Sequence, residues 1–223
     1  MRKIFLSLLI CVLFASPALA AMSDEDFIEL SLRGTLQQIQ EAIRNGANVN
    51  ARERLGDSII TPLNRAAAGN LNPEVIRVLI EAGADVNERG AFECTPLFSA
   101  IYNPNLEVMI ALIEAGADVN ARNAFGRTPL LEAIKATYLE VAILTILVNA
   151  GADVNARTDF FEMTALMMAS LWDPNPEVIT TLLNLGADPK IKNVDGRMAI
   201  DLARENEALR DTDALRKLYD LSF

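Results

Sequence analysis

Few side chains in this 223-residue chain are suited to acid–base or nucleophilic chemistry. It contains no histidine and only two cysteines, Cys11 and Cys94. A Ser-His-Asp or Cys-His arrangement therefore cannot be assembled, and zinc sites that depend on His and Cys ligands are excluded. The sequence also holds no glycine-rich phosphate loop. We predict no catalytic residue, no cofactor and no metal site.

Carboxylates are the remaining candidates for chemistry. The pairs Glu88/Glu93 and Asp24/Asp26 are close in sequence, but the chain is acidic, and such pairs are typical of solvated surfaces. Recurring Asp-Val-Asn segments offer oxygen ligands, yet they lack the Gly and Glu spacing of a calcium-binding loop. The chain is therefore predicted not to be an enzyme.

Aromatic residues recur at one position instead. Phe92, Phe125 and Phe161 each stand three residues before a threonine in a repeated motif, and Phe160 adjoins Phe161. If the motifs stack, these rings align as an exposed apolar stripe, which usually marks an interface. The alternative is that each ring folds back over its own loop. The sequence leaves both interpretations open.

The motif that carries these residues is an internal repeat. Gly-Ala-(Asn/Asp)-(Val/Pro) begins at residues 46, 83, 116, 151 and 186, in steps of 37, 33, 35 and 35. Thr-Pro-Leu recurs in phase at 61–63, 95–97 and 128–130, with altered copies Thr164-Ala165-Leu166 and Met198-Ala199-Ile200. A period near 33 residues indicates an array of helical repeats.

These motifs resemble those of the ankyrin repeat family. The resemblance rests on the Thr-Pro-Leu steps, on the alanines that follow them (Ala66, Ala67, Ala100, Ala133 and Ala169), and on the Gly-Ala-Asp-Val-Asn segments. It implies an all-α solenoid of helix–turn–helix units with short hairpin-like loops. The domain spans 21–223: an N-cap at about 24–50, repeats one to four at about 51–87, 88–120, 121–155 and 156–189, and a C-cap at about 190–223.

Local chemistry agrees with this arrangement. Thr before Pro suits a helix N-cap followed by the first helical residue, and each repeated Gly suits the left-handed end of a helix. The turns at Asn72-Pro73-Glu74 and Asn175-Pro176-Glu177 are about two residues longer than the common ankyrin turn, and each begins with a capping Asn. The family's usual His after Thr-Pro-Leu is replaced by Asn64, Phe98, Leu131, Met167 and Asp201.

The resemblance also implies where a partner would bind. In the family the loop tips touch partners, which points to Phe92, Phe125, Phe160 and Phe161. Inner-helix positions that can face the concave side are Arg65, Tyr102, Glu132, Lys135, Met168, Leu171 and Trp172. Trp172 and Tyr102 are typical interface anchors, although both can instead pack within the turn between helices.

The N-terminus predicts export. Arg2-Lys3, an apolar run from Ile4 to Ala15, and Ala18-Leu19-Ala20 together form a secretory signal peptide over residues 1–20. The apolar run is too short for a membrane span, which needs about 20 residues. With the long turns, this predicts a periplasmic protein of a Gram-negative bacterium, or a secreted one, with no membrane span after cleavage. The mature chain then retains Cys94 alone and has no internal disulfide.

Charge limits the partners. The chain has 20 basic and 30 acidic residues, and loss of Arg2 and Lys3 changes its net charge from −10 to −12. This disfavours nucleic acid and favours a protein partner with a basic surface, unless the acids are simply solvated helix faces. We expect a monomeric, non-enzymatic scaffold that binds protein through its concave face and loop tips. The alternatives are a periplasmic inhibitor or immunity-type protein that blocks an enzyme, and a lipid- or ligand-binding module.

Overall fold

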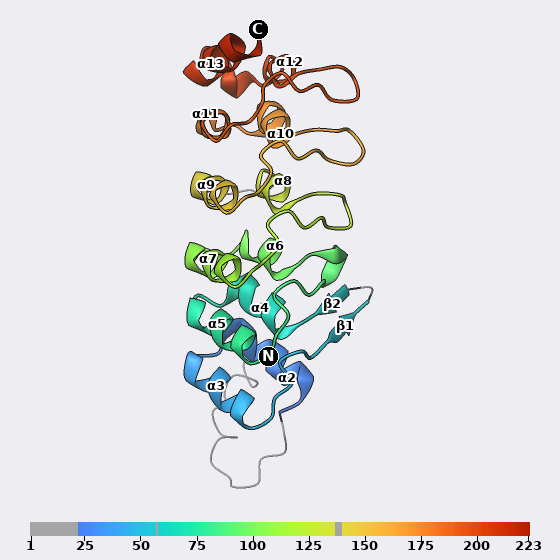
Figure 1. Cartoon of the computed structure of the whole chain (residues 1–223), viewed down its shortest axis with the longest axis vertical. Coiled ribbons are helices and arrows are strands. Elements are labelled where there is room, and N and C mark those ends of the chain that lie inside the picture. The colour runs from blue at the N-terminus through green and yellow to red at the C-terminus, as the bar shows by residue number, and fades with distance from the viewer. Residues whose placement is uncertain (1–21, 57, 137–139) are drawn as a thin grey trace, which may run out of the picture.

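The computed structural model describes residues 22–56, 58–136 and 140–223. Its helices pair in chain order and stack in two columns, as predicted (Figure 1). The inner column contains α2 (Asp24–Arg33), α4 (Pro62–Gly69), α6 (Pro96–Ala100), α8 (Pro129–Ala133), α10 (Ala165–Trp172) and α12 (Ala199–Ala203). The outer column contains α3 (Leu36–Arg44), α5 (Pro73–Glu81), α7 (Leu106–Glu114), α9 (Val141–Asn149), α11 (Pro176–Asn184) and α13 (Asp213–Ser222). The predicted signal peptide lies outside the described residues.

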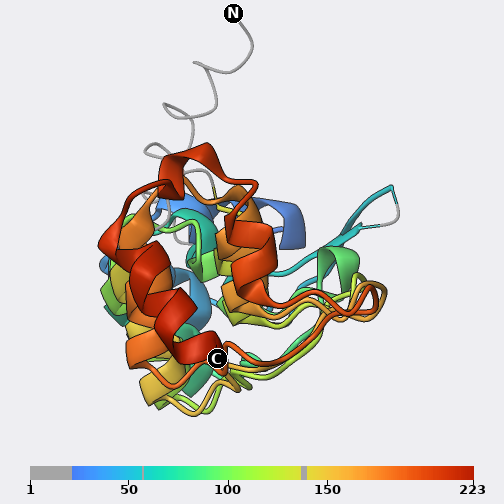
Figure 2. The same cartoon turned by 90° about the horizontal axis from the view of Figure 1, so that it is seen from above.

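The loops that lead into the inner helices after the first all project from the same side. Viewed along the array, they extend beyond the inner column; the loops of the later repeats overlie one another, and the first, drawn in cyan, lies apart from them (Figure 2). We call segments 51–60, 88–95, 121–128, 156–164 and 190–198 the tip loops. The inner helices and the tip loops thus form two walls of one concave surface.

One of the predicted hairpin-like loops forms a pair of short strands. Its strands β1 (Glu53–Leu55) and β2 (Ser58–Ile60) pair antiparallel, with Glu53 opposite Ile60. Gly56 has a φ of 63° between the strands, and β-branched Ile59 and Ile60 favour extended backbone. The next tip loop contains only a short 3₁₀ turn, η2 (Ala91–Glu93), and a second turn, η3 (Glu207–Leu209), lies in the C-cap.

The repeated Thr and Gly begin and end the helices, as the motif predicts. The side chains of Thr61, Thr128 and Thr164 accept hydrogen bonds from backbone N–H groups of the first helical turn. The repeated glycines have φ angles from 89° to 99°, at Gly46, Gly83, Gly116, Gly151 and Gly186. An added Cβ would meet no atom within 4 Å at any of them. The left-handed backbone, and not a lack of space, therefore requires glycine there.

The core runs continuously through both columns. The small residues of the motif are fully buried where inner helices meet, at Ala66, Ala67, Ala100, Ala133 and Ala169. The outer helices contribute a ridge of buried leucines: Leu79, Leu112, Leu147 and Leu182. Each helix pair thus buries its apolar side against the next pair, which is how a solenoid obtains its stability.

Asparagines at the end of each Gly-Ala-Asp-Val-Asn segment join neighbouring repeats. The Asn50, Asn87 and Asn120 amides donate to the carbonyls of Gly83, Gly116 and Gly151 at 3.0–3.2 Å. Asn155 continues the series by accepting from the Asp188 N–H at 2.8 Å. These segments therefore tie neighbouring repeats together, in agreement with the family pattern.

A second asparagine series lies at the turns between inner and outer helices. Asn70, Asn103 and Asn206 each donate two hydrogen bonds to carbonyls of the preceding unit, at 2.8–3.2 Å. Repeat four has Asp173 at the corresponding turn, and its carboxylate accepts from the Asn175 N–H at 2.8 Å. These amide bonds join the N-cap to repeat one, repeat one to repeat two, and repeat four to the C-cap. The Asp173 carboxylate cannot donate the corresponding bonds from repeat four to repeat three.

Asn64 and Asp201 occupy the place of the family's histidine, and only one of them joins repeats. The Asn64 amide donates to the Cys94 carbonyl at 3.5 Å, in the next tip loop. The Asp201 carboxylate accepts from the Met198 N–H at 2.9 Å and so caps its own helix. The other three positions, Phe98, Leu131 and Met167, are buried apolar core.

Candidate partner-binding surface

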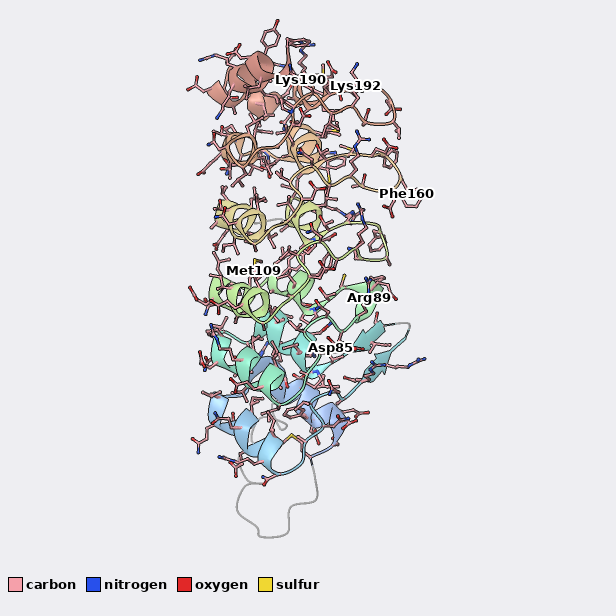
Figure 3. The ribbon with its side chains drawn as sticks, viewed as in Figure 1. Asp85, Arg89, Met109, Phe160, Lys190 and Lys192 are labelled. Atoms are coloured by element: carbon pink, nitrogen blue, oxygen red, sulfur yellow. The ribbon has the colours of Figure 1, made fainter. Side chains whose placement is uncertain are left out.

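The predicted aromatic tips are exposed. Phe92, Phe125, Phe160 and Phe161 have exposed fractions of 63%, 47%, 81% and 63%. Phe92 and Phe125 also contact each other across two tip loops, with ring centroids 5.7 Å apart. Phe160 extends outward from the end of its loop (Figure 3). The rings therefore do not cover the core, and they remain available to a partner.

Backbone strain accompanies these tips. Phe92, Glu93 and Glu162 have φ angles of 53°, 59° and 49°, in a region that residues other than glycine seldom adopt. Such conformations cost of order 1–3 kcal/mol each and persist where surrounding structure imposes them. The tips are thus held in specific conformations.

Arginines impose this order by joining consecutive tip loops. Arg89 donates to the Arg122 carbonyl at 2.8 Å, Arg122 donates to the Arg157 carbonyl at 3.0 Å, and Arg157 donates to the Lys192 carbonyl at 3.2 Å. Backbone bonds add to the series, since the Ala124 N–H donates to the Phe92 carbonyl at 2.8 Å. The four tip loops from 88–95 to 190–198 therefore form one connected surface.

A hollow of about 420 Å³ opens between repeats three and four on the concave side. Its apolar lining consists of Phe125, Phe160, Phe161, Met163, Met168 and Trp172. Arg127, Lys135 and Thr158 complete it. We call this set of nine residues the aromatic hollow; its volume falls in the range of sites that bind small ligands or a few side chains.

The aromatic hollow brings together six of the predicted site residues, but not in equal roles. Trp172 is 60% exposed at its rim, while Met168 is only 2% exposed. Met168 was predicted as a surface contact; it lies in the floor because it also packs in the inner-helix core. Leu171 is half-buried against the same core. A partner would therefore meet mainly the aromatic rings and Lys135.

A polar cluster lies beside the hollow, between repeats two and three. Glu132 pairs with Arg127 at 3.2 Å and accepts from the Tyr102 hydroxyl at 3.4 Å. Burial raises the pKa of the Tyr102 hydroxyl, and the Glu132 charge raises it further. Burial also raises the pKa of the Cys94 thiol, again with a contribution from Glu132. Both groups are therefore neutral at pH 7 and unsuited to act as nucleophiles.

Arg65 lies apart from this group. Its guanidinium pairs with Glu29 of the N-cap at 2.9 Å, and its side chain is about one-third exposed. The predicted concave residues thus divide into Arg65 near the N-cap, the Tyr102–Glu132 cluster, and the aromatic hollow. The sequence predicted the residue types but not this division into three groups, because the grouping depends on how neighbouring repeats are placed against each other in space.

Three lining residues were not predicted: Arg127, Thr158 and Met163. Arg127 places its guanidinium carbon 5.2 Å from the Phe125 ring centroid, within cation–π range. Its position one residue before Thr in the repeated motif could have indicated this contact, since Phe125 is only two residues away. Met163 and Thr158 give no such signal, because a loop of unknown path separates them from the helices.

Charge is divided between the two sides of the array. The tip loops contain nine basic and seven acidic residues, although the chain carries −10 overall. The outer helices α5, α7, α9 and α11 contain five glutamates and only one arginine. The acidic excess therefore lies away from the tip loops, and a partner with a basic surface would be attracted to the outer side.

Among residues 22–56, 58–136 and 140–223, no three His, Cys, Asp or Glu side chains gather in a way that could hold a metal ion. No helix in these ranges combines the length and the apolarity needed to cross a bilayer.

Comparisons with known proteins agree with the repeat pattern. A family model described as ankyrin repeats (3 copies) matches residues 27–123 and 117–193. A comparison with curated protein sequences finds no significant match. Among solved structures, 549 chains match. One of these chains comes from a structure of the predatory endopeptidase Bd0816 from Bdellovibrio bacteriovorus in complex with immunity protein Bd3460. The match is to the immunity protein, with a TM-score of 0.72 and 26% identity, over 88% of this chain and 99% of that chain.

Proposed function

Since the chain belongs to the ankyrin repeat family, we propose that it is a non-catalytic binding protein of the immunity type, which blocks an exported endopeptidase. One observation supports this above the others: the likeness to an immunity protein in complex with an endopeptidase, at 26% identity and over nearly the whole of that chain. The fold alone would not carry the proposal, since one fold supports many functions.

The concave surface provides the mechanism. Its tip loops are joined by the arginine-to-carbonyl bonds, and its exposed rings are already in place. Docking therefore requires little further ordering of loops, and ordering is a main cost of association. Inhibition follows when the bound array covers the entrance to the peptidase active site, with no chemistry on this chain.

Export is part of the proposal. An inhibitor must meet its target in the same compartment, and the signal peptide predicted at residues 1–20 would place the chain in the periplasm or outside the cell. The fold suits that compartment, because the mature chain has one cysteine and needs no disulfide.

The competing function is a general protein-binding scaffold. It is consistent with the ankyrin repeats, a fold that serves many partners, and it predicts binding without inhibition. The acidic outer helices help to distinguish the scaffold function from the inhibitor function. A basic partner attracted to them would bind on the outer side, and mutation of the tip loops would not affect it.

The test is inhibition of a purified peptidase. The mature chain, residues 21–223, is titrated into the Bd0816 endopeptidase and into exported endopeptidases from the organism that produces the chain, and peptide-bond hydrolysis is followed. We expect activity to fall to near zero at a one-to-one ratio with at least one of these enzymes. Gel filtration of the mixture should show the complex.

A pair of variants gives the control. Phe160→Ala/Phe161→Ala should abolish inhibition, while Tyr219→Ala/Phe223→Ala, which removes exposed aromatics from the C-cap, should leave it unchanged. Both should keep the circular dichroism spectrum of the parent chain. Binding to a peptidase with no loss of hydrolysis, or stable complexes only with proteins that are not hydrolases, would instead establish the general scaffold.

A further inference from the structure

The aromatic hollow combines two properties that together define an occupant. Its rim presents large exposed apolar side chains: Phe160, Phe161 and Trp172. Single exposed apolar residues are ordinary on protein surfaces, but three around one concavity are typical of an interaction site. Met163 and Met168 form a floor of unbranched side chains that can adjust to the shape of an inserted group. The hollow therefore suits a bulky apolar side chain.

The charged residues of the hollow are both cations. The positive charge of Arg127 is largely neutralised by Glu132, because the two side chains pair at 3.2 Å and both are mostly buried. Lys135 is exposed, and it has no carboxylate within 4.0 Å in the part of the chain that the structure describes. No carboxylate lines the hollow. The local charge is thus positive, opposite to that of the chain as a whole.

We propose that the aromatic hollow is the principal anchor site for the partner, and that it receives a protruding loop bearing a bulky apolar side chain next to an Asp or Glu. The apolar group fills the hollow above Met168, and the carboxylate pairs with Lys135. This rests on the proposed function and specifies its partner surface: the docking loop of the peptidase is apolar and acidic, not basic. Residues of this kind at the centre of an interface account for most of its binding energy.

A second copy of this chain is the main competing occupant. Its Phe223 is 71% exposed, and the exposed Asp220 stands three residues before it, so the two could supply an aromatic ring and a carboxylate. Such a contact would be head to tail and would continue into filaments rather than close into a dimer. The acidic charge of the chain opposes that assembly, so we favour a loop of a different protein.

The test uses selected peptides, and so does not depend on finding the natural partner. A phage-displayed library of random 12-residue peptides is selected on the mature chain and counter-selected on its Phe160→Ala variant. Binding is then measured by fluorescence, because Trp172 is the only tryptophan and lies at the rim. We expect a consensus of Phe, Tyr, Trp, Leu or Met beside Asp or Glu, and a shift of Trp172 emission to shorter wavelength on binding.

Matched lysine variants test the charge. Lys135→Glu should weaken the selected peptides at least tenfold, while Lys190→Glu, on the following tip loop (Figure 3), should change affinity less than twofold. A consensus rich in Lys or Arg would overturn the proposed occupant. Peptides that bind the Phe160→Ala variant equally well, or no enrichment at all, would overturn the site. Concentration-dependent filaments that disappear when Phe223 is deleted would identify the second copy.

These outcomes are separate from the test of inhibition. If the acidic peptides bind the hollow but no endopeptidase is inhibited, the anchor site stands and the inhibitor function fails. If an endopeptidase is inhibited equally by the parent chain and by the Lys135→Glu variant, the function stands and the anchor site fails.

Discussion

Thr95 and Thr128 begin equivalent inner helices, yet their hydroxyls have different surroundings. Thr128 accepts from the Leu131 N–H at 3.4 Å, whereas the Thr95 hydroxyl is buried with no hydrogen-bond partner among the described residues. A buried unpaired hydroxyl costs about 1–3 kcal/mol, and a capping Thr contributes about 1 kcal/mol. The same residue type therefore makes a capping hydrogen bond at one helix and leaves a buried hydroxyl unpaired at the other.

We expect Thr95→Val to raise the free energy of unfolding by about 1 kcal/mol, and Thr128→Val to lower it by about the same amount. Valine keeps the shape of threonine and removes only the hydroxyl. Urea unfolding followed by circular dichroism measures both. Equal losses in the two variants would show that Thr95 makes a hydrogen bond after all.

The Cys94 thiol should react slowly. Its pKa is raised by burial and by the Glu132 carboxylate, so less thiolate is present at neutral pH than in a free cysteine. We expect Ellman's reagent to modify Cys94 more slowly than it modifies glutathione at pH 8. The rate at Cys94 should continue to rise at pH values above the pKa of an ordinary cysteine. Glu132→Gln should lower the thiol pKa and speed the reaction, and Glu162→Gln, two tip loops further along the chain, should not. A Glu132→Gln rate identical to that of the parent chain would contradict this.

At the scale of elements, the turn-side asparagines predict the effect of Asp173. Asn70, Asn103 and Asn206 donate across units, but a carboxylate cannot donate. Burial also raises the Asp173 pKa, because the charged form is poorly solvated there. We expect Asp173→Asn to raise the free energy of unfolding by about 0.5–1.5 kcal/mol at pH 7, through the donor it supplies and the charge it removes.

The gain should depend on pH in a defined direction. The Asp173 pKa is higher in the folded chain than in the unfolded one, so the parent chain is stabilised at low pH and loses that stability as pH rises through the folded-state value. The advantage of Asp173→Asn should thus shrink on acidification, in urea titrations at several pH values. The reciprocal variant Asn103→Asp should lose stability at pH 7, and an advantage of Asp173→Asn that grows as pH falls would refute the argument.

The elements were largely predictable from sequence because they depend on local chemistry. Thr caps, Pro at the first helical position and Gly at the helix end act within a few residues, so the repeated motif predicts where helices begin and end. Hairpin-like loops were predicted, but not which of them would form paired strands, since that depends on one tip loop being able to extend. The aromatic hollow was predicted only as scattered residues, because its depth comes from the displacement of one repeat against the next. Burial of Met168 has the same origin.

At the scale of the whole molecule, the C-cap closes the core. α13 contacts α11 and α12, and Leu218 on its inner side is fully buried, while Leu221 on its outer side is 46% exposed. We expect Leu218→Ala to lower the free energy of unfolding by about 2–4 kcal/mol, as for other buried leucines, and Leu221→Ala to change it by less than about 0.5 kcal/mol. Urea unfolding measures both changes in free energy. If Leu218→Ala changed the free energy of unfolding as little as Leu221→Ala does, the C-cap would unfold independently of the array.

The two asparagine series have a mechanical consequence. One series joins consecutive repeats along the Gly-Ala-Asp-Val-Asn segments, and the other joins turns through Asn70, Asn103 and Asn206. Along the turns, Asp173 is the described position that cannot donate such bonds, because its carboxylate only accepts. Under tension between the termini, the joint that repeat four makes with repeat three would therefore open first on its turn side, while the Asn155 bond still holds the opposite side. The array would then lengthen by bending at this joint, before any helix unwinds.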